Sequence, residues 1–107
     1  MQDYVNDWLR EHKHTDDPTY FKLIAPHIVC GDGTKLSVQA SDGHYCEPHS
    51  HSGPWNAVEV GYVTNADGKP MRPHSFAGGQ HPSDGIYGFV PVPRVNKFIH
   101  RHGGIKQ

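Results

Sequence analysis

The sequence has neither a long apolar run nor a run of basic residues, and each absence excludes a class of protein. No segment approaches the about 20 apolar residues that a membrane-spanning helix needs. The ten Lys and Arg residues are scattered and the formal net charge is -1. A protein that grips nucleic-acid phosphates normally carries a basic face instead. The sequence therefore predicts no membrane insertion and no binding to DNA or RNA.

Cysteine is scarce as well, with Cys30 and Cys46 as the two examples. The polar and acidic start, MQDYVNDWLREHK, does not have the charged and then apolar pattern of a secretory signal. We therefore expect a cytoplasmic protein in which both cysteines are free thiols rather than a disulfide.

Apolar residues make up 35% of the chain, while 12 glycines and 9 prolines indicate long loops. A length of 107 residues predicts a single domain spanning 1–107. Within it, 1–19 is expected to form an N-terminal helix and linker, and 20–107 a sheet core with a C-terminal helix. A domain this small buries little apolar surface, so we expect a homodimer.

Helical patterns stand at both ends of the chain. Residues 3–13 predict a short helix with Asp3 as its N-cap, because the apolar residues Tyr4, Val5, Trp8 and Leu9 form one stripe. Residues 91–102 predict a second helix, with prolines in its first turn and Gly103 just beyond its end.

The middle of the chain predicts strands. They are expected at 20–25, in a hairpin over 27–40 around Gly31-Asp32-Gly33, at 56–63 and at 86–90. Residues 65–85 are expected to form a long irregular stretch. This order predicts an α+β fold: a small, twisted, antiparallel sheet of four or five strands with an N-terminal and a C-terminal helix.

Two of these strands carry more detailed expectations. In the second strand of the hairpin, alternation predicts that Leu36, Val38 and Ala40 face the core and that Lys35, Ser37 and Gln39 face water. In the strand at 56–63, Val58, Val60 and Tyr62 are expected to share one face, and Gly61 to mark a bulge or a close backbone approach.

The polar segment from Ser41 to Trp55 is the leading candidate for a functional site. Ten histidines are present in all, and this segment concentrates three of them around a cysteine. Imidazole and thiolate are the ligands that zinc and copper favour. The candidate metal ligands are His44, Cys46, His49 and His51. A solvent-exposed polar loop with an incidental thiol is the alternative, as is a thiol nucleophile at Cys46 beside a histidine.

Further candidates for ligand or partner contact lie on and next to the strands. Trp55, Tyr45 and Tyr87 are expected either to form an aromatic wall or to belong to the core and its rim. Glu59 and Asp84 offer a carboxylate pair, although Glu59 is expected to be a solvated strand residue rather than a general base. With His44, His49 and His51, these residues complete the predicted binding site.

From about residue 26 onward, the chain resembles a family of small uncharacterised proteins encoded by phages and prophages. The resemblance is carried by Asp32-Gly33, LSVQAS (36–41), HYCEP (44–48), GPW (53–55), VEVGY (58–62) and DGIYGFVPVPRVNKFIHRHGGI (84–105). It implies a protein expressed inside a bacterial host cell and implies no particular activity. The family commonly has an Arg after its HYC-x-P stretch, where this chain has His49, so a polar contact surface is favoured over a metal site.

Three functions remain open at this stage. The first is a non-enzymatic binding protein acting on a host protein or a small anionic ligand, with a counter-defence role by analogy with other phage accessory proteins. The second is a metal-binding protein or metal-dependent hydrolase with zinc at the His and Cys cluster. The third is a structural or interaction module of a virion.

Overall fold

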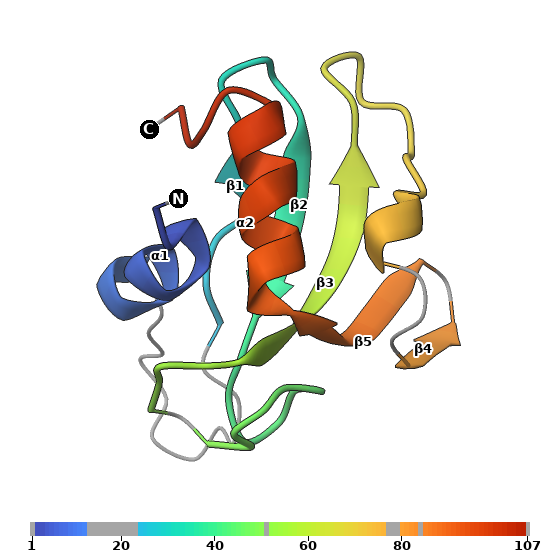
Figure 1. Ribbon diagram of the computed structural model, residues 1–107. Helices are drawn as coiled ribbons and strands as arrows, with labels where there is room; N and C mark the ends of the chain where they lie inside the picture. The colour runs from blue at the N-terminus through green and yellow to red at the C-terminus, as the bar shows by residue number, and fades with distance from the viewer. Residues whose placement is uncertain (1, 13–23, 51, 77–79, 84, 107) are drawn as a thin grey trace.

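The computed structural model describes residues 2–12, 24–50, 52–76, 80–83 and 85–106, and it contains the predicted sheet and both predicted helices (Figure 1). The elements are α1 (Tyr4–His12), β1 (Ile28–Val29), β2 (Lys35–Gln39), β3 (Ala57–Thr64), the 3-10 helix η1 (His74–Phe76), β4 (Gln80–Ser83), β5 (Ile86–Pro91) and α2 (Val92–Arg101). All strand pairs are antiparallel, in the order β1-β2-β3-β5-β4. The α+β class is therefore confirmed.

Helix α1 begins where the sequence predicts. Asp3 Oδ1 accepts a hydrogen bond from the Asn6 backbone N–H at 3.1 Å, as an N-cap does. The predicted apolar stripe turns inward, with Val5, Trp8 and Leu9 buried. A helix of nine residues needs such packing to persist.

Helix α2 also follows its sequence signals, with Pro91 directly before it and Pro93 in its first turn. Gly103 ends it in the left-handed region at φ 95°. Its close approach to the β1–β2 turn explains a second glycine, because a Cβ at Gly31 would lie 2.6 Å from the Gly103 carbonyl oxygen. Neither α1 nor α2 has the length and apolarity to cross a bilayer.

Both helices lie on one face of the sheet (Figure 1). The core fills the space between them and includes residues that alternate along the strands, such as Val38, Val58 and Val60. Register partners point to the same side of a sheet, so the Val38–Val60 and Val58–Val90 pairs define this helix-covered face. No helix of the described residues covers the opposite face (Figure 1).

The prediction that one side of β2 faces water is wrong for Ser37 and Gln39. Ser37 and Gln39 are each only 7% exposed. The Gln39 side chain bonds the backbone of Ala25, because Nε2 donates to the Ala25 carbonyl at 2.8 Å and Oε1 accepts from the Ala25 N–H at 2.9 Å. The alternation rule fails here because the segment that contains Ala25 covers the Gln39 side chain. The Gln39 amide in turn provides the hydrogen bonds that the buried backbone of Ala25 needs.

Strand β3 contains the bulge predicted at Gly61. Its register with β2 shifts between the Ser37–Gly61 and Lys35–Thr64 pairs, so β3 holds one extra residue. Tyr62 occupies the bulge with φ 52° and is exposed, whereas Val63 is buried. The prediction that Tyr62 shares a face with Val58 and Val60 is wrong, because the extra residue reverses the alternation.

Strand β5 bulges in the same way, which the sequence analysis did not predict. Its register with β3 shifts between the Val58–Val90 and Val60–Tyr87 pairs, and Phe89 takes φ 54°. Phe89 is exposed while Tyr87 and Val90 are buried.

The stretch predicted as irregular contains two further elements, η1 and β4. Phe76 of η1 is fully buried, with its ring centroid 5.0 Å from that of Phe98 and 5.9 Å from that of Tyr87. The strand expected at 20–25 falls largely outside the described residues.

Candidate functional site

The segment 41–55 buries His44 and Cys46 of its histidine and cysteine cluster, whereas His49 is exposed. His44, Cys46 and Trp55 are all buried. Nδ1 of His44 lies 2.7 Å from Ser41 Oγ, and the Cys46 thiol donates to the Ser41 carbonyl at 3.2 Å. A solvent-exposed polar loop is therefore not what the structure has at these three residues, because their side-chain polar atoms find partners inside the loop.

The other predicted site residues are spread over different parts of the molecule. Tyr45 and His49 are exposed, and Glu59 is half-buried on β3. Tyr87 belongs to the core on the helix-covered face, where it packs against Phe76. His51 and Asp84 lie outside the described residues, so the predicted pairing of Glu59 with Asp84 stays a prediction.

The metal site gains no support from this arrangement. Within the described parts of the chain, no three His, Cys, Asp or Glu side chains are grouped so that they could hold a metal ion. Of the four predicted ligands, His44 and Cys46 bond to neighbouring protein atoms and His49 is exposed. Zinc at this cluster stays a prediction that includes His51.

A different set of side chains comes together on the face of the sheet without a helix. We call it the aromatic face and define it by Tyr45, Tyr62, Phe89, His27 and Glu59. The three aromatic residues are 48%, 63% and 38% exposed respectively, and with Ile24 they are the exposed large hydrophobic residues of the described chain. The face joins the 41–55 loop to three strands or strand ends.

Two backbone groups of Tyr45, its N–H and its carbonyl, attach this residue to the aromatic face by hydrogen bonds. The Tyr45 N–H donates to Glu59 Oε1 at 3.2 Å, and the Tyr45 carbonyl accepts from the Phe89 N–H at 3.0 Å. The Tyr45 and Phe89 ring centroids are 5.9 Å apart at an interplanar angle of 51°, in the range of favourable aromatic pairs. The loop therefore lies over Glu59 and next to the bulge of β5.

At the other end of the aromatic face, Tyr62 stacks on His27. Their ring centroids are 6.0 Å apart and nearly parallel, with an interplanar angle of 16°. His27 precedes Ile28, which pairs with Leu36 on the helix-covered side, so alternation places His27 on the opposite side. Between the two aromatic groups lies Gly61, whose missing side chain leaves room for Ile86.

Tyr62 and Phe89 both adopt a left-handed backbone conformation that bulky residues rarely take. Such a conformation costs on the order of 1–3 kcal/mol and concentrates at functional sites. Each residue follows a glycine within a strand, Gly61 and Gly88 respectively. A Gly-aromatic pair inside a strand is the sequence signal that could have found both of them.

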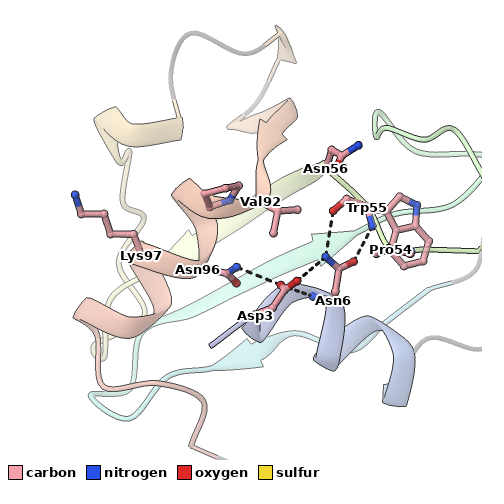
Figure 2. A pocket seen from close by; sticks show the side chains of 9 residues that line it. Asp3, Asn6, Pro54, Trp55, Asn56, Val92, Asn96 and Lys97 are labelled. Atoms are coloured by element: carbon pink, nitrogen blue, oxygen red, sulfur yellow. Dashed lines mark hydrogen bonds between the residues drawn. The ribbon is translucent and has the colours of Figure 1, made fainter. Parts of the chain in front are cut away.

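A pocket of about 620 Å³ opens on the other side of the molecule, where the N-terminal ends of α1 and α2 meet the segment 54–56 (Figure 2). Its volume is in the range of small-molecule sites. The lining residues are Asp3, Asn6, Pro54, Trp55, Asn56, Val92, Pro93, Asn96 and Lys97. Trp55 is the only one of them that the sequence analysis assigned to a site.

The polar groups of this pocket hold the fold together (Figure 2). Asn6 donates to Asp3 and to the Trp55 carbonyl, and accepts from the Trp55 N–H at 2.8 Å. Asn96 donates to Asp3 and accepts from the Val5 N–H. Burial acts to raise the pKa of Asp3, but the hydrogen bonds from Asn6 and Asn96 and the charge of Arg10 lower it overall. The pocket therefore contains both a carboxylate, at Asp3, and a cation, at Lys97, and its charge does not select for or against an anionic ligand.

Comparison with models of protein families, with curated proteins and with solved structures finds no match to this chain. The resemblance to phage and prophage proteins therefore stays a prediction. The candidate site rests on the geometry of the aromatic face alone.

Proposed function

We propose that the protein is a non-enzymatic binding protein whose aromatic face contacts another protein. The observation that carries this proposal is the display of Tyr45, Tyr62 and Phe89 on a face without a helix, two of them on left-handed backbone. Tyrosine and phenylalanine are enriched in protein interfaces, where rigid aromatic side chains bury large areas. If stability alone determined the placement of these rings, burial in the core would be the favoured position for them.

The area of the face is small for an obligate dimer of this chain. Taking about 200 Å² for a fully exposed aromatic side chain, the three rings present about 300 Å². This is at the lower end of the about 300–600 Å² that the largest apolar patch of a typical monomer covers, and such patches are often functional. Obligate dimers bury at least about 1,000 Å² per subunit. The predicted homodimer is accordingly the alternative outcome of the test.

The chemistry of the face also favours a protein over a small anionic ligand. Glu59 places a carboxylate beside Tyr45 and Phe89, and this charge repels an anion. The phage or prophage origin, the bacterial host cytoplasm and a role against host defence belong to the same proposal. They rest on the sequence resemblance and on analogy.

The test compares variants of the aromatic face in retention experiments with host lysate. Tyr62→Asn and Phe89→Asn remove the rings and suit the left-handed backbone, because asparagine tolerates it. Lys97→Ala, on the opposite side of the molecule, is the matched control. We expect a protein that is retained by the wild type and by the control but lost by both Asn variants.

Two results would overturn the proposal. The first is that the same proteins are retained by all variants, or that none is retained by the wild type. The second is sedimentation of a dimer that Tyr62→Asn dissociates, which would assign the face to a second copy. We expect a monomer in sedimentation for the wild type and for every variant.

A further inference from the structure

We propose that the aromatic face binds a cationic side chain of the partner, an arginine or lysine, at Glu59 beside the paired rings of Tyr45 and Phe89. This inference rests on the proposed function and names the chemistry that the partner presents. Three observations carry it: the unused capacity of the carboxylate, the position of the two rings and the charges on this part of the sheet.

The Glu59 carboxylate has capacity for a further donor. One of its oxygens, Oε1, accepts the Tyr45 N–H, and within the described chain Glu59 makes no other hydrogen bond and no ion pair. A carboxylate has about four lone-pair sites and accepts a guanidinium in bidentate fashion. Glu59 is half-buried and its hydrogen bond with Tyr45 is exposed, so a ligand can reach the carboxylate from solvent beside the aromatic rings.

The neighbours of Glu59 on the sheet do not compete for it. Its register partner Gln39 is engaged with Ala25 and Ser37 through its own amide. The nearest cation on β2, Lys35, is exposed and pairs in register with Thr64, beyond the bulge. The carboxylate therefore keeps its charge available to a partner.

The rings complete a site for a cation. Tyr45 is fixed over Glu59 by its own backbone N–H, and Phe89 is fixed beside Tyr45 by the hydrogen bond to the Tyr45 carbonyl. The two rings stand at 51° to each other rather than stacked face to face, so ring surface stays open toward solvent. A cation over such a face is attracted to the ring quadrupole, most strongly for arginine, which also stacks.

The left-handed backbone at Phe89 has a direct part in this geometry. In the bulge of β5, the Phe89 N–H points to Tyr45 rather than into the strand ladder, and its ring reaches the face instead of the core. Counted from Val90, which faces the helices, Phe89 points to the aromatic face, and the extra residue of the bulge lets Tyr87 face the helices as well. The strain at Phe89 is thus linked to the second ring beside Glu59, and we call the site formed by Glu59, Tyr45 and Phe89 the cradle.

The experiment titrates the isolated protein with N-acetyl-arginine-methylamide and follows backbone amide signals by NMR at low ionic strength. The matched probe is the citrulline analogue, which has the same shape without the charge. We expect saturable shifts at Tyr45, Glu59 and Phe89 with the arginine probe. The citrulline probe should bind about tenfold more weakly, as loss of a charge-assisted hydrogen bond predicts.

Glu59→Gln is the decisive variant, because glutamine keeps an acceptor for the Tyr45 N–H and removes the charge. It should weaken the arginine probe about tenfold, whereas Glu11→Gln, at an exposed carboxylate on α1, should leave binding unchanged. Equal binding of both probes, equal binding by Glu59→Gln and wild type, or no shift at these amides would overturn the cradle.

The cradle and the proposed function fail in different ways. In one outcome, the Phe89→Asn variant loses a host protein that the Glu59→Gln variant retains with unchanged affinity. This result would support the aromatic face as an interface and refute the cationic contact. In the other outcome, every variant retains the same host proteins, while the arginine probe still shifts the amide signals of Tyr45, Glu59 and Phe89. This result would support the cradle and refute a host protein as its partner.

Discussion

The side chain of Gln39 takes the place of a neighbouring strand for Ala25: its amide bonds both the N–H and the carbonyl of that residue. Both groups are buried, and the same amide also donates to Ser37 Oγ at 3.0 Å. This pair fixes the segment leading into β1 against the sheet. It explains why a strand with alternating polar residues is buried on both sides.

Replacing Gln39 should therefore destabilise the protein more than its polar character suggests. Gln39→Ala leaves the N–H and the carbonyl of Ala25 without partners, at an expected loss of about 1–3 kcal/mol in the free energy of unfolding. Urea denaturation measures this loss. Lys35→Ala, at the exposed start of the same strand, is the control and should stay within about 0.5 kcal/mol of the wild type. Equal effects of the two substitutions would contradict the role given to Gln39.

The left-handed backbone of Tyr62 and Phe89 predicts an unusual preference for glycine over alanine at both positions. Both substitutions remove the ring, but only glycine also removes the Cβ that makes this conformation costly, so the Gly variant should exceed the Ala variant by about 1 kcal/mol in the free energy of unfolding. Thermal unfolding of the two variants measures the difference. Tyr45 is the control at a residue without positive φ, and there the Gly variant should not be more stable than the Ala variant. If the Ala variants at Tyr62 and Phe89 are the more stable ones, the conformation is not strained.

Acid should weaken the connection between the β1–β2 turn and the end of α2. The Thr34 N–H and the His102 ring, whose Nδ1 is 2.7 Å from Asp32 Oδ2, lower the pKa of Asp32 from its usual 3.8 to about 2. A lowered pKa stabilises the folded state above pH 3.8, and this contribution is lost as the pH falls toward 2.

Asp32→Asn should accordingly remove part of the pH dependence of stability between about pH 4 and pH 2. Denaturation at a series of pH values measures the slope, with Asp67→Asn as a control in an exposed turn. An unchanged slope in Asp32→Asn, or an equal change in the control, would show that the pairing with Thr34 and His102 does not stabilise the fold.

Cys30 should be unreactive at neutral pH. Burial, and secondarily the negative charge of Asp32, raise the pKa of its thiol from 9.0 to about 11. Since the thiolate is the reactive form, alkylation of Cys30 by iodoacetamide in the native protein should be far slower than in urea. Mass spectrometry of peptides locates the modification. Fast native labelling of Cys30 would show that it is neither buried nor held as a thiol.

Much of the fold could be predicted because its signals are local. The N-cap Asp3, the apolar stripe of α1, the first-turn prolines of α2 and Gly103 each act within one turn of a helix. The glycines of the β1–β2 turn likewise specify a hairpin without reference to the rest of the chain. The strand β4 was missed, because Pro82 and the glycines before it are typical of loops.

The candidate site was much less predictable, because residue type does not reveal burial. His44, Cys46 and Trp55 have the chemistry of a ligand site, yet neighbouring carbonyls and hydroxyls satisfy them inside the fold. Tyr45 and Glu59 were recognised as candidates, but their link through a backbone N–H was not.

The sequence by itself determined the two helices and the central strands and marked Gly61 as an irregular point of β3, since propensity, capping and periodicity act between near neighbours in the chain. Only the tertiary structure decided which side of each strand is wet and which rings face outward. A single extra residue in β3, and another in β5, reverses the alternation beyond it. Pairing between distant strands places those residues, and local pattern carries no information about it.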